Sequence, residues 1–384
     1  MGWSEQQAMT LRWPDAGVAE QPRRGDATIL AVTLLLVAVG LGMIYSASGV
    51  MAHKRFGDAS YFLKRQMLWL LVGLGCLLVV ARADLNTVRR WALPTLCLGM
   101  LGLALVLIPG IGVTVNGARR WLRVGAWTIQ PSEVMKVGIV LYLAHYLAKK
   151  GSRLTDFRRG FLPPLVVVGL IVGLIVIEPD MGTATVIGWV TLGLLFMGGA
   201  RLGHLMLIGL AALPVLYVLV MRVPYRLKRI TSFLDPWSDP AGSGFQVIQS
   251  QLALGSGGLS GVGLGEGRQK LFYLPEPHTD FVLSALGEEA GFLGTFAVLL
   301  LLAWFVARGF AIALDAEDPF ARYLALGVSL LVGCHALINV GVITGLLPTK
   351  GLTLPFVSYG GSSLVVNMIG TGLLIAVSRH RLPI

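Results

Sequence analysis

The sequence predicts an all-α polytopic membrane protein with about ten transmembrane helices and a large extracytoplasmic loop between the seventh and eighth. Of its 384 residues, 55% are hydrophobic and only 13% are charged, and the mean hydropathy is +0.75. A soluble domain usually carries charges at about 25% of its positions. Several apolar stretches reach about 18 to 22 residues, the length at which a helix crosses about 30 Å of hydrocarbon.

Hydropathy places the expected spans at residues 28–49, 66–82, 91–109, 131–148, 162–178, 182–199, 203–221, 284–307, 323–345 and 356–377. The interval of about 222–283 is the only substantial segment expected outside the lipid. We therefore predict a cytoplasmic N-terminal tail, residues 1–27, followed by one transmembrane domain, residues 28–384, that includes this long outer loop. No cleaved signal peptide is expected, because no short apolar region with a cleavage site precedes the first span.

The long loop is expected to be irregular, since Pro224, Pro236, Pro240 and the glycine-rich run 255–265 interrupt regular structure. Lysine and arginine orient the chain with its N-terminus in the cytoplasm, because the long loop, where the positive-inside rule loses force, holds many of the outer basic residues. The net charge of +11 is spread over short loops, which favours anionic lipid head groups or a phosphorylated lipid over nucleic acid. The basic residues expected outside the membrane before the long loop are Lys54, Arg55, Lys64, Arg65, Arg119, Arg120 and Arg123.

The densest polar cluster, residues 274–281, is expected where the long loop re-enters the membrane before the eighth span. Its Asp280 is our candidate catalytic residue. A carboxylate at the mouth of a partly dry cavity has a raised pKa and becomes a better proton acceptor. The alternative is structural, because Thr279 or Asp280 just before an apolar run makes a good helix N-cap.

Glu133 and Lys136 lie three residues apart at the start of the fourth span, so they share a helix face and can form an ion pair. Ionisable residues inside a membrane are functional candidates by default. The alternative is a structural pair that neutralises itself and holds two helices together.

Arg119, Arg120 and Arg123 lie with Trp121 in a short outer segment. Arginine side chains suit phosphate oxygens, although the same residues could simply anchor the interface. Residues 178–183 and 235–240 read as tight turns, and the small residues of 358–363 favour close helix packing. The three cysteines lie in apolar segments without metal-ligand spacing, so no metal site is expected from them.

Taken together, five motifs resemble the SEDS proteins (shape, elongation, division and sporulation), the RodA/FtsW/SpoVE family. They lie in family order at residues 116–121, 130–136, 178–183, 275–281 and 355–363. Residues 347–355 resemble the division-type FtsW branch more than the elongation-type RodA branch. Pro277 and Ala290 depart from the usual pattern, but neither is ionisable.

The resemblance implies an inverting peptidoglycan glycosyltransferase that polymerises lipid II, an undecaprenyl diphosphate-linked disaccharide pentapeptide, at the outer face of the bacterial cytoplasmic (inner) membrane. It implies action at the division septum with a class B penicillin-binding protein transpeptidase, other divisome proteins and membrane lipids as partners. The family's essential aspartate falls on Asp280, and its ion pair falls on Glu133 and Lys136.

In this reaction a sugar 4-hydroxyl attacks the anomeric carbon of a second lipid-linked sugar, so a base and cations for the diphosphate are needed. Asp280 suits the base. The candidate cations are Arg119, Arg120, Arg123, Arg226, Lys228 and Lys270. The resemblance adds the substrate-binding candidates His278, Thr279, Ser358 and Ser362. No cofactor is expected with certainty, but a bound divalent cation, Mg or Mn, could offset the same charge.

Three alternatives remain open from the sequence: a lipid II flippase, an elongation-type polymerase and a noncatalytic scaffold. A flippase needs polar groups along a transmembrane path, whereas the polar clusters here are expected mainly at the outer face. A scaffold predicts that Asp280→Asn would keep its function in cells.

Overall fold

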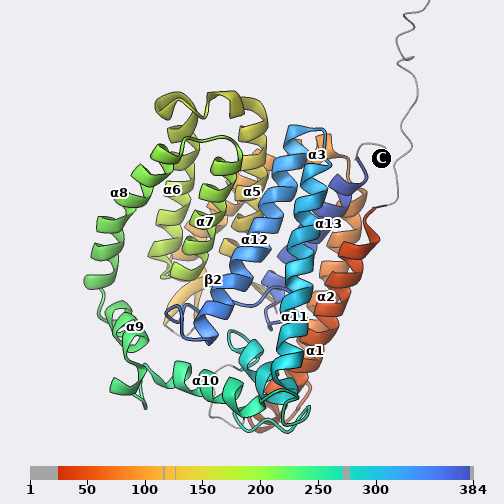
Figure 1. The fold of residues 1–384 in the computed structure, drawn as a ribbon, viewed down its shortest axis with the longest axis vertical. Helices are drawn as coiled ribbons and strands as arrows, with labels where there is room; N and C mark the ends of the chain where they lie inside the picture. The colour runs from red at the N-terminus through yellow and green to blue at the C-terminus, as the bar shows by residue number, and fades with distance from the viewer. Residues whose placement is uncertain (1–24, 116, 126, 271–276, 381–384) are drawn as a thin grey trace, which may run out of the picture.

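The computed structural model in Figure 1 describes residues 25–115, 117–125, 127–270 and 277–380. Most of the expected N-terminal tail and the first three residues of the polar cluster therefore lie outside the described residues, as does Asn116. The helices are α1 (Ala27–Phe56), α2 (Tyr61–Arg82), α3 (Leu85–Arg90), α4 (Ala92–Leu107), α5 (Pro131–Lys150), η2 (Gly151–Arg153), η3 (Phe157–Phe161), α6 (Leu162–Ile177), α7 (Met181–Met197), α8 (Leu202–Met221), α9 (Pro224–Leu234), η4 (Pro236–Ser238), α10 (Phe245–Gly257), α11 (Val282–Leu314), α12 (Pro319–Ile343) and α13 (Gly361–Ser378).

The expected membrane class is confirmed: within the described ranges, seven helical segments are long and apolar enough to cross a membrane. These are α1, α2, the continuous η3–α6 segment, α8, α11, α12 and α13, while α4 and α7 are shorter apolar helices. The ends follow local chemistry. Asp26 caps α1 by accepting hydrogen bonds from two backbone amides, and Pro131 begins α5 at a position where no amide hydrogen is needed.

The arginine-rich segment between α4 and α5 is a small antiparallel sheet, which the sequence analysis treated as a loop. Its strands are β1 (Gly112–Val115), β2 (Ala118–Val124) and β3 (Trp127–Ile129), in that order across the sheet. Gly117 and Gly125 lie in the two turns between these strands, with φ of +78° and +62°, a backbone region that glycine enters at little cost.

The long loop is more regular than expected. Pro224 and Pro236 begin α9 and η4 instead of interrupting helices, because proline is favoured at a first helical position. The glycine-rich run is irregular after Gly257, and it packs backbone to backbone against α11. A Cβ at Gly257 would lie 1.8 Å from the Gly287 carbonyl oxygen, so this approach requires glycine.

The contact falls where α11 is broken. Gly291 has a φ of +66° within α11, which interrupts the helical hydrogen bonds. The amides of Val262 and Gly263 donate to the carbonyls of Glu288 and Glu289 at 3.0 and 3.1 Å. Loop backbone therefore satisfies groups that the helix break leaves open.

The core of the bundle lies around α5 and α12. Helix α12 packs against α5, α7, α11 and α13, and α2 packs along α13. Helix α8 differs, because none of its residues is buried. Figure 1 shows α8 at the edge of the molecule, joined to α9, which lies beside the ends of the central helices.

Candidate active site

Asp280 lies in the turn, residues 277–281, that precedes α11. The backbone carbonyls of His278, Thr279 and Asp280 each accept a hydrogen bond from a distant part of the chain. The donors are the Tyr359 amide (2.8 Å), the Ser358 hydroxyl (2.6 Å) and the Asn339 side-chain amide (2.9 Å). Three successive peptide groups are thereby fixed, which holds the Asp280 backbone in one position.

Two of these donors have further partners that lock them in place. Asn339, on α12 and 1% exposed, also donates to the Leu352 carbonyl at 2.8 Å. The Ser358 hydroxyl accepts from the Leu354 amide at 2.8 Å. The Ser358 hydroxyl therefore holds the backbone of the Asp280 turn, whereas the resemblance suggested that it contacts the substrate. Asn339 was not predicted, and its only sequence signal is an amide inside an apolar span.

Asp280 lines a cavity of about 260 Å³, here called the Asp280 cavity. Its walls come from α9, α10, α12 and the segment 344–360 that follows α12. Polar wall residues include Arg229, Gln246, Asn339 and Lys350. The carboxylate is close to the backbone of Gly351, since a Cβ there would lie 3.3 Å from Asp280 Oδ2.

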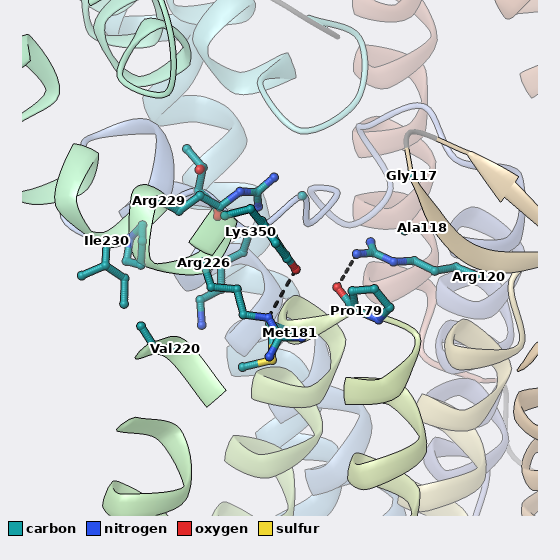
Figure 2. Close-up of a pocket in the computed structure, with 14 residues that line it drawn as sticks. Gly117, Ala118, Arg120, Pro179, Met181, Val220, Arg226, Arg229, Ile230 and Lys350 are labelled. Carbon is teal, nitrogen blue, oxygen red and sulfur yellow. Dashed lines mark hydrogen bonds between the residues drawn. The ribbon is translucent and has the colours of Figure 1, made fainter. Parts of the chain in front are cut away.

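A second cavity of about 350 Å³ adjoins the first, and the two share Arg229, Thr349, Lys350 and Gly351. It is here called the cationic cavity. Figure 2 shows Arg120 entering it from one side and Arg226, Arg229 and Lys350 from the other. The sequence analysis proposed Arg120 and Arg226 as cations but not Arg229 or Lys350.

The other predicted arginines of the sheet lie elsewhere. Arg119 donates to the Leu107 carbonyl at 3.1 Å and lines a separate cavity with Thr114. Arg123 is exposed. Arg120 lines the cationic cavity and Arg119 does not. The β1–β2 register is irregular at this point, since Val113 pairs with Trp121 and Thr114 with Arg119.

The predicted lysines are also apart from this group. Lys228 is exposed and pairs with Asp239 at 2.9 Å. Lys270 is buried, pairs with Glu289 at 2.8 Å and lines a third cavity between α1 and α11. Neither lysine lines the Asp280 cavity or the cationic cavity.

Glu133 and Lys136 form the expected ion pair, with Glu133 Oε2 and Lys136 Nζ 2.6 Å apart and both residues buried. Lys136 Nζ is also 3.2 Å from His335 Nε2 on α12. The Lys136–His335 contact therefore links the ion pair on α5 to α12. His335 lies one helical turn before Asn339, so this buried cluster and the clamp on Asp280 share a helix face.

The turn between α6 and α7 approaches both α5 and the cationic cavity. Asp180 caps α7 and accepts from Gln130 Nε2 at 3.1 Å and from Ser132 at 3.3 Å. Burial and the nearby Asp180 charge raise the pKa of Glu178 to about 8, although Arg120 opposes that shift.

Two further candidates have mainly structural surroundings. The Ser362 hydroxyl accepts a hydrogen bond from the backbone amide of Gln130 at 3.2 Å and is buried at the start of α13. His278 is buried against Phe62 and Tyr359, and burial lowers its pKa to about 4. Its imidazole is therefore neutral at physiological pH.

No group of three or more His, Cys, Asp or Glu side chains suited to a metal ion occurs among the described residues. The arrangement around Asp280 thus combines one positioned carboxylate with a neighbouring group of cations. Such a site can accept a proton and stabilise a polyanionic leaving group.

Comparison with known proteins places the whole fold. Residues 26–382 match the FtsW/RodA/SpoVE family model, described as cell cycle protein. A "Probable peptidoglycan glycosyltransferase FtsW" of Trichlorobacter lovleyi is 48% identical over 353 residues, covering 92% of this chain and 93% of the relative. Stage V sporulation protein E of Bacillus subtilis is 46% identical over 355 residues, covering 92% and 97%.

Solved structures agree with this. One, described as "Structural coordination of polymerization and crosslinking by a peptidoglycan synthase complex", has a TM-score of 0.76 at 32% identity, covering 92% of this chain and 98% of that one. The rod shape determining protein RodA of Thermus thermophilus has a TM-score of 0.69 at 30% identity, covering 94% and 98%. The chain therefore belongs to the FtsW/RodA/SpoVE family of cell cycle proteins.

Proposed function

We propose that this protein is a peptidoglycan glycosyltransferase that polymerises lipid II, with Asp280 as the general base. The observation that carries the proposal is the fixed turn, which holds Asp280 at a cavity that adjoins a group of cations. Relatives 46–48% identical to this chain are named probable peptidoglycan glycosyltransferases, which supports the same activity.

The step requires one proton transfer and one displacement. The 4-hydroxyl oxygen of the acceptor sugar bonds to the anomeric carbon of the donor as its proton passes to Asp280. The bond from that carbon to the diphosphate oxygen breaks, and its electron pair leaves with the polyprenyl diphosphate. Attack opposite the leaving group inverts the anomeric centre, and Asp280 then releases its proton to water.

We place the reaction at the outer face of the cytoplasmic membrane. Helices lie at all ten of the expected spans, and counting each as a crossing puts the Asp280 turn and the arginine-rich sheet on the same side as the long loop. Location at the division septum follows the division-type resemblance of residues 347–355. The related synthase complex, which coordinates polymerization with crosslinking, supports a class B penicillin-binding protein as partner.

Other divisome proteins as partners and a Mg or Mn ion at the diphosphate remain predictions. Magnesium is often bound by one or two carboxylates together with substrate phosphates, so Asp280 could contribute one ligand beside the diphosphate. Glycan synthesis with and without a chelator, followed by restoring each ion separately, tests this requirement.

The flippase alternative draws on the buried Glu133, Lys136 and His335 cluster. In that cluster Lys136 pairs with Glu133 and contacts His335, which links α5 to α12, so it suits a structural link better than a transport path, although His335 Nδ1 has no hydrogen-bond partner among the described residues. The names of the relatives also favour the polymerase over a flippase.

The test is polymerisation of purified lipid II in liposomes by the full chain with its class B partner, comparing wild type with Asp280→Asn. We expect glycan ladders from wild type and none from a well-folded Asp280→Asn protein. Turnover by Asp280→Asn at the wild-type rate would remove the base assignment. Lipid II that crosses the membrane without any ladder would instead favour a flippase.

A further inference from the structure

The cationic cavity has an unusual charge balance. Arg120, Arg226, Arg229 and Lys350 line it, yet within the described ranges none of them forms an ion pair with a carboxylate. By contrast, the neighbouring Lys228 on α9 pairs with Asp239. Charges of one sign gathered around a concave surface create a potential that attracts an anion.

The three guanidinium groups donate instead to backbone carbonyls. Arg120 donates to the carbonyls of Glu178 and Pro179, the latter bond drawn in Figure 2. Arg229 donates to the Thr349 carbonyl at 3.0 Å, and Arg226 donates to the Leu219 carbonyl at 3.1 Å. These bonds orient the side chains, and none of them is to a carboxylate.

Two carboxylates, Glu178 and Asp180, flank the lining residue Pro179, and Asp180 accepts hydrogen bonds from Gln130 and Ser132. Glu178 lies at the Arg120 contact, but its pKa of about 8 leaves it mostly protonated at pH 7. Lys350 donates to the Thr185 hydroxyl at 3.1 Å, and burial lowers the pKa of its amine, as expected for a cation without an anionic partner.

Lys350 and Arg229 also line the Asp280 cavity, so the cation group continues to the proposed base. Apolar residues of α8, α9 and α7 also line the cationic cavity: Val220, Ile230 and Met181. The cavity thus joins a cationic region beside the proposed reaction centre to an apolar wall that includes the end of α8. This polarity matches a phosphorylated lipid.

We propose that the cationic cavity binds the diphosphate of the donor lipid, with Lys350 and Arg229 at its junction with the Asp280 cavity. The assignment rests on the proposed glycosyltransferase function. It replaces Arg119, Arg123, Lys228 and Lys270 by Arg229 and Lys350 among the cations that offset the leaving group. The polyprenyl chain would leave the cavity along the apolar side of α8 and α9.

The experiment uses the full chain with its class B partner in liposomes. Initial rates of lipid II polymerisation are measured with undecaprenyl diphosphate, undecaprenyl monophosphate or undecaprenol as inhibitors, which share one chain and differ in head-group charge. Lys350→Met and Arg229→Gln remove one charge each, and Lys350→Arg keeps it. Arg222→Gln is the matched control, because Arg222 is exposed between α8 and α9 and lines neither cavity.

In wild type, the diphosphate should inhibit most strongly and the alcohol least. Loss of one charge-assisted hydrogen bond should raise both the inhibition constant of the diphosphate and KM for lipid II about 10- to 100-fold. Inhibition by the alcohol should not change, Lys350→Arg should recover most of the loss, and Arg222→Gln should behave as wild type. Arg229 is exposed, so its variant should fold even if Lys350→Met does not.

Equal inhibition by the diphosphate and the alcohol would overturn the assignment. Unchanged inhibition constants and KM in both Arg229→Gln and Lys350→Met would overturn it as well. If the wild-type protein makes no glycan, the proposed glycosyltransferase function fails, and this assay no longer tests the diphosphate site. Native mass spectrometry of the same proteins with undecaprenyl diphosphate then tests the anion site alone, and equal binding by wild type and Arg229→Gln would refute it.

Discussion

Replacing Asn339 by alanine tests whether the clamp on the Asp280 turn has a catalytic consequence. The side-chain amide of Asn339 donates to the carbonyls of Asp280 and Leu352 at 2.9 and 2.8 Å. Asn339→Ala leaves both acceptors without this donor in a buried site. Each unsatisfied buried group costs about 1–3 kcal/mol, so the expected loss is about 2–6 kcal/mol of unfolding free energy.

The kinetic effect follows from position, because a shift of about 1 Å in a catalytic group can reduce turnover about 100-fold. We therefore expect Asn339→Ala to lower kcat for lipid II polymerisation by about that factor in protein that is still folded. The assay is the ladder reaction with the partner present, alongside thermal unfolding of the same preparation. Ser329→Ala is the control, since Ser329 is buried on the same helix but bonds only to the Ala325 carbonyl within α12.

Two results would refute this reasoning. Unchanged unfolding of Asn339→Ala would contradict the two hydrogen bonds themselves. A large loss of stability with a wild-type kcat would show that the clamp stabilises the fold without positioning Asp280.

Three further predictions concern other parts of the structure. Lys136→Met should lower the free energy of unfolding by about 3–5 kcal/mol, because it leaves the Glu133 carboxylate buried without its partner. The double variant with Glu133→Gln should unfold at a higher temperature than Lys136→Met alone. Because the pKa of the Glu178 carboxyl is raised from 4.5 to about 8 in the folded state, the folded protein holds this proton more tightly than the unfolded chain. The free energy of unfolding should therefore fall by about 1.4 kcal/mol per pH unit as the pH rises from 4.5 to about 8. The unfolding temperature of Glu178→Gln should lack this dependence on pH. Gly261→Ala should lower the unfolding temperature, because its Cβ would lie 2.2 Å from the Glu289 carbonyl oxygen at a φ of +81°, whereas Gly255→Ala, with open space around its Cβ, should not.

The sequence predicted the helices well because the length of an apolar run is set by the thickness of the bilayer, independent of tertiary contacts. Helices lie at all the expected positions, although α1 extends to Phe56 and α11 to Leu314, beyond the ends that hydropathy placed. The sheet between α4 and α5 could not be predicted in this way, because its strands are short and its turns depend on two glycines with positive φ.

The candidate site was only partly predictable for a different reason. Arg119 and Arg120 are equivalent in the sequence, yet only Arg120 lines the cationic cavity. The irregular strand register at Arg120, which distinguishes the two, is not evident from the sequence. Lys350 and Arg229 come from segments more than 100 residues apart, and they line the same cavities because α9 lies against the segment after α12, where Arg229 donates to the Thr349 carbonyl at 3.0 Å. Long-range placement of this kind leaves no local pattern.

The buried ion pair gains a clearer role from the same geometry. A Glu133–Lys136 pair inside a membrane helix is expensive to desolvate and is weak evidence for stability by itself. Lys136 also contacts His335, however, so the pair is linked to the face of α12 that turns toward α5. Asn339 lies one turn further along that face, so a rotation of α12 that broke the His335 contact would also withdraw the donor that holds the Asp280 carbonyl. Two motifs far apart in the sequence therefore act on one turn, and the orientation of a single helix connects them.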